Sequence, residues 1–120
     1  MQDFRNLDVW QKAHSLALDV YRSTKDFPIQ EQFGLKSQVR RAGSAIPANL
    51  AEGCGRGSDA DFARFVQNAL GSASELDYHL LLCHDLGYLS EETYQNLYKQ
   101  TTRTMRMLNG LLNKLRASSR

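Results

Sequence analysis

Apolar residues recur every three or four positions along four stretches of the chain, the spacing of one buried face on an amphipathic helix. The first stretch runs from about Leu7 to Lys25. Pro28 closes it, because proline disfavours a helical conformation in the preceding residue. Its apolar stripe consists of Val9, Ala13, Leu16, Ala17, Val20 and Thr24. The pattern predicts one amphipathic helix here.

The second stretch begins near Gly34 and contains an internal proline, Pro47. Its apolar face carries Leu35, Val39, Ala42, Ile46 and Leu50. Pro47 has no N–H for the carbonyl of Gly43, so a kink is expected. Because the apolar spacing continues past Pro47, one kinked helix is favoured over two short ones. Gly53 or Gly55 is expected to end this helix in the left-handed conformation.

The third stretch is the longest, with Ser58 as its N-cap, Asp61 in a capping box and Gly87 at its end. Its main stripe consists of Phe62, Phe65, Ala69, Ala73, Leu76, Leu80 and Cys83. A second stripe lies nearly opposite and consists of Gly71, Tyr78 and Leu82, with Glu75 among them. A single four-helix monomer covers one side of such a helix well, so the second stripe indicates a homo-oligomer.

The fourth stretch opens with Ser90 as N-cap, and Glu91 and Glu92 occupy the first turn, where the helix dipole favours negative charge. Its apolar positions alternate between steps of four and three, the period of a left-handed bundle. They are Tyr94, Tyr98, Thr101, Met105, Leu108, Leu112 and Leu115. Only the link "GYL" separates it from the third stretch, which makes the two antiparallel neighbours. Residues 1–120 are therefore expected to form one all-α domain, an up-down-up-down antiparallel four-helix bundle.

Charge is distributed unevenly along the chain. The 15 basic and 13 acidic residues give a net charge of +2, far from that of a dedicated nucleic-acid module. The fourth helix is nevertheless basic, and Lys99, Arg103 and Arg106 lie off its apolar seam. Such a stripe can follow the backbone of RNA or DNA, with Arg40 and Arg56 as further candidate contacts. The alternative is a solvated face near a helix C-terminus, but symmetric assembly would gather several copies into one large patch.

A set of polar residues beside the apolar face of the second helix is a candidate for a helix or subunit interface. It comprises Arg41, Asn49, Glu52 and Arg56, with Glu75 on the second face of the third helix. A partly buried carboxylate is costly unless paired, and arginine is its best partner. We expect an Arg41–Glu75 or Arg56–Glu52 type of network at a helix or subunit interface, the alternative being a solvated face.

The remaining chemistry-bearing residues favour structural roles. The glycines in "EGCGRGSD" follow a helix, are spaced G-x-G-x-G and lack a lysine, so helix punctuation is favoured over phosphate binding. His79 and Cys83 could share a metal, but no third ligand has matching spacing. We therefore expect no metal, no cofactor and no enzymatic activity. Only two cysteines are present and no apolar run approaches the roughly 18 residues of a membrane span, so a cytoplasmic protein with reduced thiols is expected.

Two segments resemble a known family. "RRAGSAIPANLAEGCGR" runs from Arg40 to Arg56, and "FVQNALGSASEL" runs from Phe65 to Leu76. With the flanking sequence, over roughly residues 4 to 89, they resemble the bacterial four-helix bundle proteins named after intervening sequences of 23S ribosomal RNA genes. Val66 and Cys54 are small departures from the pattern.

This resemblance implies a bundle that assembles as a ring, a pentamer, and a distant likeness to the nucleic-acid-binding accessory protein of diversity-generating retroelements. It implies no catalytic residues. The expectation is a non-enzymatic homo-oligomer that binds RNA or DNA weakly. The alternative is a protein-binding scaffold without nucleic-acid binding.

Overall fold

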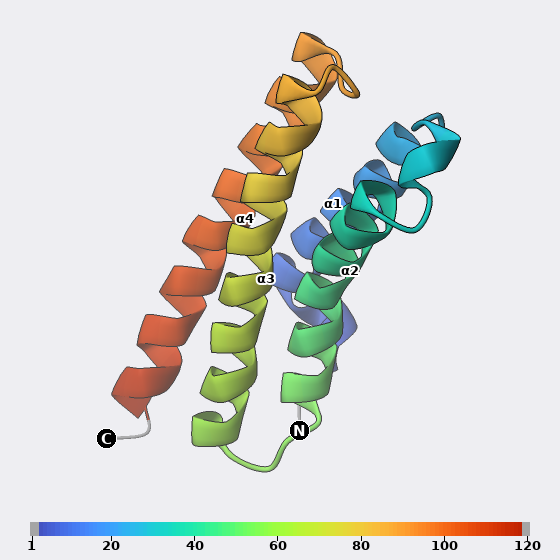
Figure 1. Ribbon diagram of the computed structural model, residues 1–120. Coiled ribbons are helices and arrows are strands. Elements are labelled where there is room, and N and C mark those ends of the chain that lie inside the picture. Colours follow the sequence, from blue (N-terminus) through green and yellow to red (C-terminus); the bar gives the residue numbers. More distant parts are fainter. Residues whose placement is uncertain (1–2, 119–120) are drawn as a thin grey trace.

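A computed structural model of the protein describes residues 3–118 (Figure 1). Four long helices make up most of this structure. They are α1 (Asp8–Thr24), α2 (Leu35–Cys54), α3 (Asp59–Asp85) and α4 (Glu91–Ser118). Two short 3-10 helices, η1 (Phe4–Asn6) and η2 (Ile29–Glu31), precede α1 and α2. No strand occurs within residues 3–118, and the predicted all-α class is confirmed.

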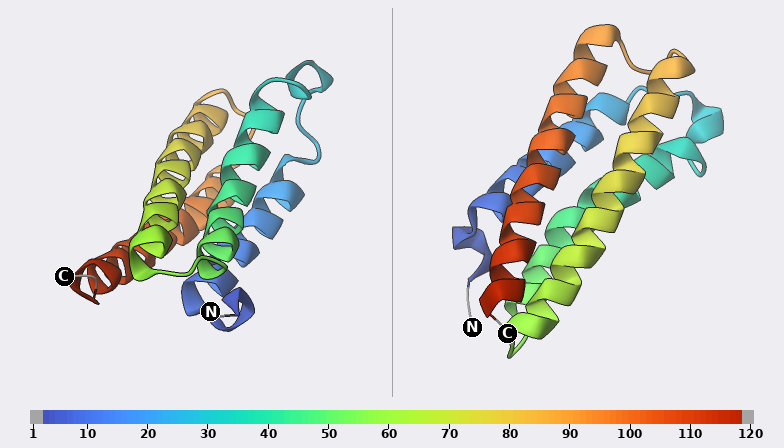
Figure 2. Two further views of the ribbon diagram at one scale, coloured as in Figure 1. Left: turned by 90° about the horizontal axis from the view of Figure 1, so that it is seen from below. Right: turned by 90° about the vertical axis from the view of Figure 1, so that its left-hand side faces the viewer.

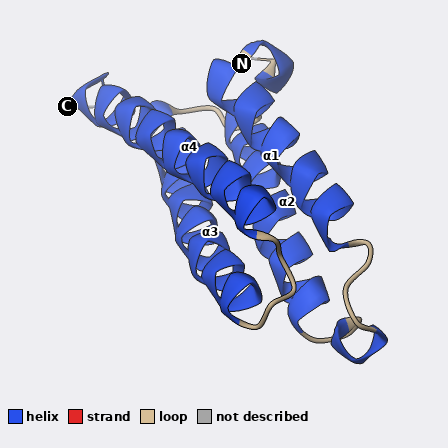
Figure 3. Cartoon of the chain, turned by 90° about the horizontal axis from the view of Figure 1, so that it is seen from above, coloured by secondary structure: helices blue, strands red, loops and turns tan. Residues whose placement is uncertain are grey.

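The helices form an up-down-up-down bundle, as predicted. Each packs against its neighbour in the chain, and α4 also packs against α1, which closes the ring (Figures 2 and 3). The bundle measures 47 × 22 × 20 Å. The α2–α3 loop lies at the same end as the start of α1 and the end of α4, whereas the α1–α2 and α3–α4 connections lie at the opposite end (Figure 1). Helix α2 continues through Pro47 as one helix.

The core is built from the faces that the apolar spacing predicted on the first three helices. Every residue of the stripe predicted for α1, for α2 and for the main face of α3 is buried. Leucine and isoleucine side chains that are fully buried run along the whole bundle. They are Leu16, Ile46, Leu50, Leu76, Leu80, Leu97 and Leu108. Burial of these side chains contributes most of the stability of such a bundle, at roughly 1.5–3 kcal/mol for each.

The apolar seam of α4 differs from the predicted one. Tyr98 is 41% exposed, while Leu97 and Thr104 are buried. Thr104 can be buried because its hydroxyl donates to the carbonyl oxygen of Gln100 at 2.8 Å, so no polar atom is left without a partner. Tyrosine prefers the edge of a core, where its hydroxyl reaches water. The prediction was therefore wrong for Tyr98, whereas Tyr94 is half-buried against the core. The predicted positions Thr101, Leu108, Leu112 and Leu115 are buried.

The helix ends show which capping predictions hold. The hydroxyl of Ser58 accepts the amide of Asp61 and that of Ser90 accepts the amide of Thr93, both at 3.1 Å, so both N-caps are confirmed. Gly87, with φ of +82°, ends α3 in the left-handed conformation. The same expectation for the end of α2 was wrong, because Gly55 has φ of −82° and Gly53 lies within the helix. Gly53 is instead a point of close packing between α2 and the phenylalanines at the start of α3.

One hydrogen bond joins the two connections at the same end of the bundle. The hydroxyl of Tyr88, in the α3–α4 turn, donates to Glu31 Oε2 at 3.0 Å. Glu31 Oε1 also accepts the amide of Leu35 at 3.1 Å, so this carboxylate caps the start of α2. The Phe27 and Tyr88 rings pack with centroids 5.4 Å apart. Glu31 therefore fixes the α1–α2 connection against the rest of the bundle.

The Tyr88–Glu31 bond predicts a change in stability at alkaline pH. The hydrogen bond to Glu31, followed by burial and the charge of that carboxylate, raises the pKa of Tyr88 above its ordinary value of 10.0. The neutral phenol is thus favoured in the folded state, and its contribution is present below about pH 10 and lost as the pH rises through the folded pKa. Urea unfolding of the wild type and of Tyr88→Phe should show a stability difference that shrinks in alkali. A constant difference would contradict this role for the bond.

Candidate functional site

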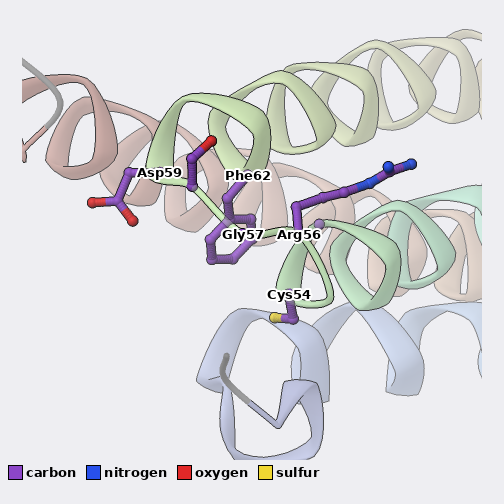
Figure 4. A pocket seen from close by; sticks show the side chains of 7 residues that line it. Cys54, Arg56, Gly57, Asp59 and Phe62 are labelled. Atoms are coloured by element: carbon purple, nitrogen blue, oxygen red, sulfur yellow. The ribbon is translucent and has the colours of Figure 1, made fainter.

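The glycine-rich loop between α2 and α3 borders a hollow of about 330 Å³ (Figure 4). Arg56 and Asp59 extend away from it on opposite sides, while Phe62 and Cys54 form an apolar part of its wall (Figure 4). Arg56 pairs with Glu52 at 2.8 Å, and its guanidinium lies 4.7 Å from the centre of the Phe65 ring. Arg56 is thus engaged by Glu52 and Phe65. Asp59 adds negative charge, so the side chains around the hollow do not favour a phosphate. Its glycines serve helix packing and the turn.

The two cysteines are buried thiols without nucleophilic character. Burial raises the pKa of Cys54 and raises the pKa of Cys83 to about 12. Both side chains are therefore protonated at neutral pH, and the thiolate is the nucleophilic form.

The predicted polar network is divided between separate places in the fold. Glu52 and Arg56 form an ion pair on the surface of α2 and the following turn. Glu75 instead lies 3.4 Å from His79 Nε2 on α3. Asn49 donates to the carbonyl of Ala45 at 2.8 Å, within α2. Arg41 is exposed in the groove between α1 and α2. Arg41 and Glu75 therefore do not pair with each other and lie in separate places in the structure.

Histidines lie next to acidic residues near the α3–α4 turn. His84 Nε2 is 2.5 Å from Glu91 Oε2, and the imidazole stacks on the Tyr94 ring with centroids 4.4 Å apart. Hydrogen bonds from Gln95 and His84 lower the pKa of Glu91. Nowhere in the described part of the chain do three His, Cys, Asp or Glu side chains come together in a way that could hold a metal ion. The cluster links the start of α4 to the end of α3.

The basic face of α4 is the most coherent candidate for binding. From Lys99 to Ser118 the helix carries five cationic side chains and no carboxylate. Lys99, Arg103 and Arg106 are all exposed. Arg103 and Lys12 of α1 line one hollow of about 180 Å³, whose other lining residues are Ser15, Gln100 and Thr104. Two helices therefore direct positive charge to one groove that has no acidic lining residue.

Lys12 is a member of this site that the sequence analysis did not single out. The signal was available in the fold itself, because an up-down-up-down bundle places its first helix beside its last. Gln100 reinforces this contact, since its side-chain amide donates to Asp19 Oδ2 of α1 at 2.8 Å.

Arg40, a candidate contact for nucleic acid, has a structural role in this fold. Its guanidinium donates to Thr24 Oγ1 at 2.9 Å and to the carbonyl of Tyr21 at 3.0 Å. It also lies over the Tyr21 ring, 4.5 Å from its centre. Carbonyls in the last turn of a helix lack intrahelical donors, and a cation is favourable there. Arg40 thus satisfies the end of α1 and fixes α2 against it.

Comparison with known proteins agrees with this architecture. The family model described as "23S rRNA-intervening sequence protein" matches residues 5–110. The chain belongs to this family. A crystal structure of a protein of unknown function from the S23 ribosomal protein family of Bacteroides thetaiotaomicron VPI-5482 is similar, with a TM-score of 0.78 and 27% sequence identity. The match covers 87% of this chain and 97% of that one.

The comparisons leave the activity of this member of the 23S rRNA-intervening sequence protein family open. No curated protein matches it. Neither the family description nor that of the solved relative names a catalytic reaction. Within residues 3–118, none of the helices has the length and hydropathy that a membrane-spanning segment needs.

Proposed function

We propose that the protein is a non-enzymatic homo-oligomer that binds RNA or DNA weakly through the basic face formed by α4 and α1. The observation that carries the proposal is the shared groove of Lys12 and Arg103, which has no carboxylate in its lining. No ion pair within residues 3–118 engages the four cations of this face, which are Lys12, Lys99, Arg103 and Arg106. Their charge is available to phosphates, each contact adding salt-dependent affinity.

Self-association is supported by the outer face of α3. Tyr78 is 59% exposed there, Leu81 and Leu86 are also exposed, and Leu82 is half-buried. An apolar face of this kind favours contact with another protein surface. A ring of five, as the family resemblance implies, would multiply the basic face of α4. Glu75, on the same helix, would then lie close to the contact between protomers.

Fluorescence anisotropy of a labelled RNA across a salt series tests this proposal, with the oligomeric mass fixed by light scattering. The logarithm of the association constant should fall linearly with the logarithm of salt concentration. The double variant Arg103→Glu/Arg106→Glu should bind much more weakly at an unchanged mass, because both cations become repulsive. The salt slope should lose about one unit for each phosphate contact removed.

Arg64→Glu provides a matched control for Arg103→Glu alone. Arg64 is exposed on α3, which carries five carboxylates, and the net charge changes by the same amount. Only the α4 variant should weaken binding. If the wild type does not bind RNA or DNA even at low salt, the basic face is merely solvated. The exposed apolar face of α3 would then favour the protein-binding scaffold.

A further inference from the structure

The groove between α1 and the start of α2 combines cations with aromatic rings. It encloses about 490 Å³ and is separate from the α4 face. Its lining includes Lys36, Arg40 and Arg41, the rings of Tyr21 and Phe33, and no carboxylate. Between Lys36 and Ala51, helix α2 has no acidic residue. The groove thus has a positive potential beside two ring faces.

Phe33 is displayed to solvent by a segment that is held in place. The residue is 91% exposed, whereas Phe27, Phe62 and Phe65 are buried. The connection that carries it is anchored by Glu31, which bonds Tyr88 and the amide of Leu35, and by the amide of Gly34, which donates to the Glu31 carbonyl at 3.1 Å. An exposed phenyl ring on an anchored turn has no role in the core and is positioned for a flat apolar partner.

The cations in this groove divide into one that is engaged and two that are available. Arg40 is held by Thr24 and the Tyr21 carbonyl and covers the Tyr21 ring. Arg41 is exposed, and neither it nor Lys36 takes part in an ion pair within residues 3–118. Lys36 makes one long contact, 3.4 Å, to the carbonyl of Lys25. Lys36 also lies in the first turn of α2, where the helix dipole adds positive potential.

We propose that this groove binds single-stranded nucleic acid, with a base stacked on Phe33 and the adjoining phosphates on Lys36 and Arg41. A cationic groove with an exposed aromatic ring is the arrangement that recognises unpaired strands, because every base has a ring face. In a duplex these faces are covered by the neighbouring base pairs. An acidic peptide would use the cations and leave Phe33 without a partner. The site goes beyond the basic face of α4 and does not depend on it.

Binding of a labelled polyuridine strand, and of the same strand paired with polyadenosine, tests the proposal on the full chain. Phe33→Ala should weaken binding of the single strand roughly tenfold, leave its salt slope unchanged and leave duplex binding unaffected. Ile29→Ala is the matched control, since Ile29 is 77% exposed in the same connection but outside the groove, and it should change nothing.

Loss of the phosphate contacts should change the salt dependence of binding, which loss of the Phe33 ring should not. Lys36→Gln/Arg41→Gln should reduce the salt slope for the single strand by about 1.4, or roughly 0.7 for each contact. Light scattering on Phe33→Ala tests whether the groove is occupied by a second copy of the chain and not by single-stranded nucleic acid. A change in mass would overturn the proposal, because the ring would then be a contact between protomers.

The failure of this site and that of the α4 face give different results. If the groove variants bind the single strand like the wild type while Arg103→Glu/Arg106→Glu abolishes binding, this proposal falls and the proposed function stands. If the groove variants weaken single-strand binding and the α4 variant does not, the groove is supported and the α4 face is rejected.

Discussion

Replacing Gly53 by alanine is expected to lower the free energy of unfolding by about 1–3 kcal/mol. A methyl group at this position would lie 2.8 Å from Phe62 Cδ1 and 2.9 Å from Phe65 Cβ. These atoms have little freedom to move, because both phenylalanines are buried and the Phe65 ring is covered by the guanidinium groups of Arg56 and Arg64. Helix α3 would therefore have to shift away from α2. Urea unfolding followed by circular dichroism measures the loss.

Gly43→Ala is the matched control, since Gly43 is a second buried glycine in the same helix. A methyl group there would meet Val20 at 3.5 Å, an ordinary van der Waals distance. Alanine also has the higher helix propensity, so this variant should be more stable by up to about 1 kcal/mol. Equal effects of the two substitutions would show that propensity, and not the close approach of α3, decides the outcome at Gly53.

Patterns within one helix were sufficient to predict the fold. The period of the apolar residues located all four helices, and the serines before the third and fourth identified their N-caps because a capping hydroxyl acts on an amide three residues away. The short connection between α3 and α4 made those helices antiparallel. Each of these signals is local, so a single sequence contains it.

Features that depend on how the helices approach one another could not be predicted from patterns within one helix. Gly53 has the sequence context of a helix end, and only the position of Phe62 on α3 shows that it is a packing residue. Arg40 resembles a surface cation, but its partners Thr24 and Tyr21 are 16 and 19 positions away. Lys12 and Arg103 become neighbours only when the ring of helices closes. Of the candidate binding face, the sequence therefore predicted the α4 half.

The revised seam of α4 has a consequence that a pair of variants can test. Leu97→Ala is expected to cost about 2–5 kcal/mol, because the side chain is fully buried and its removal leaves a cavity in the core. Tyr98→Ala, on the adjacent position, should cost only about 1 kcal/mol, since 41% of Tyr98 is exposed. Urea unfolding of both variants, at an oligomeric mass verified by light scattering, gives the order of the two effects.

The order of these two costs decides between two registers of the same helix. The predicted seam combines Thr101 with Tyr98, whereas the observed seam combines it with Leu97 and Thr104. Both threonines are buried because each hydroxyl bonds the carbonyl four residues before it. That internal bond removes the cost of burying a polar atom, so hydropathy alone ranks the two faces wrongly. A larger loss for Tyr98→Ala than for Leu97→Ala would restore the tyrosine seam. It would also turn Lys99, Arg103 and Arg106 relative to α1 and thereby remove the groove on which the proposed function rests.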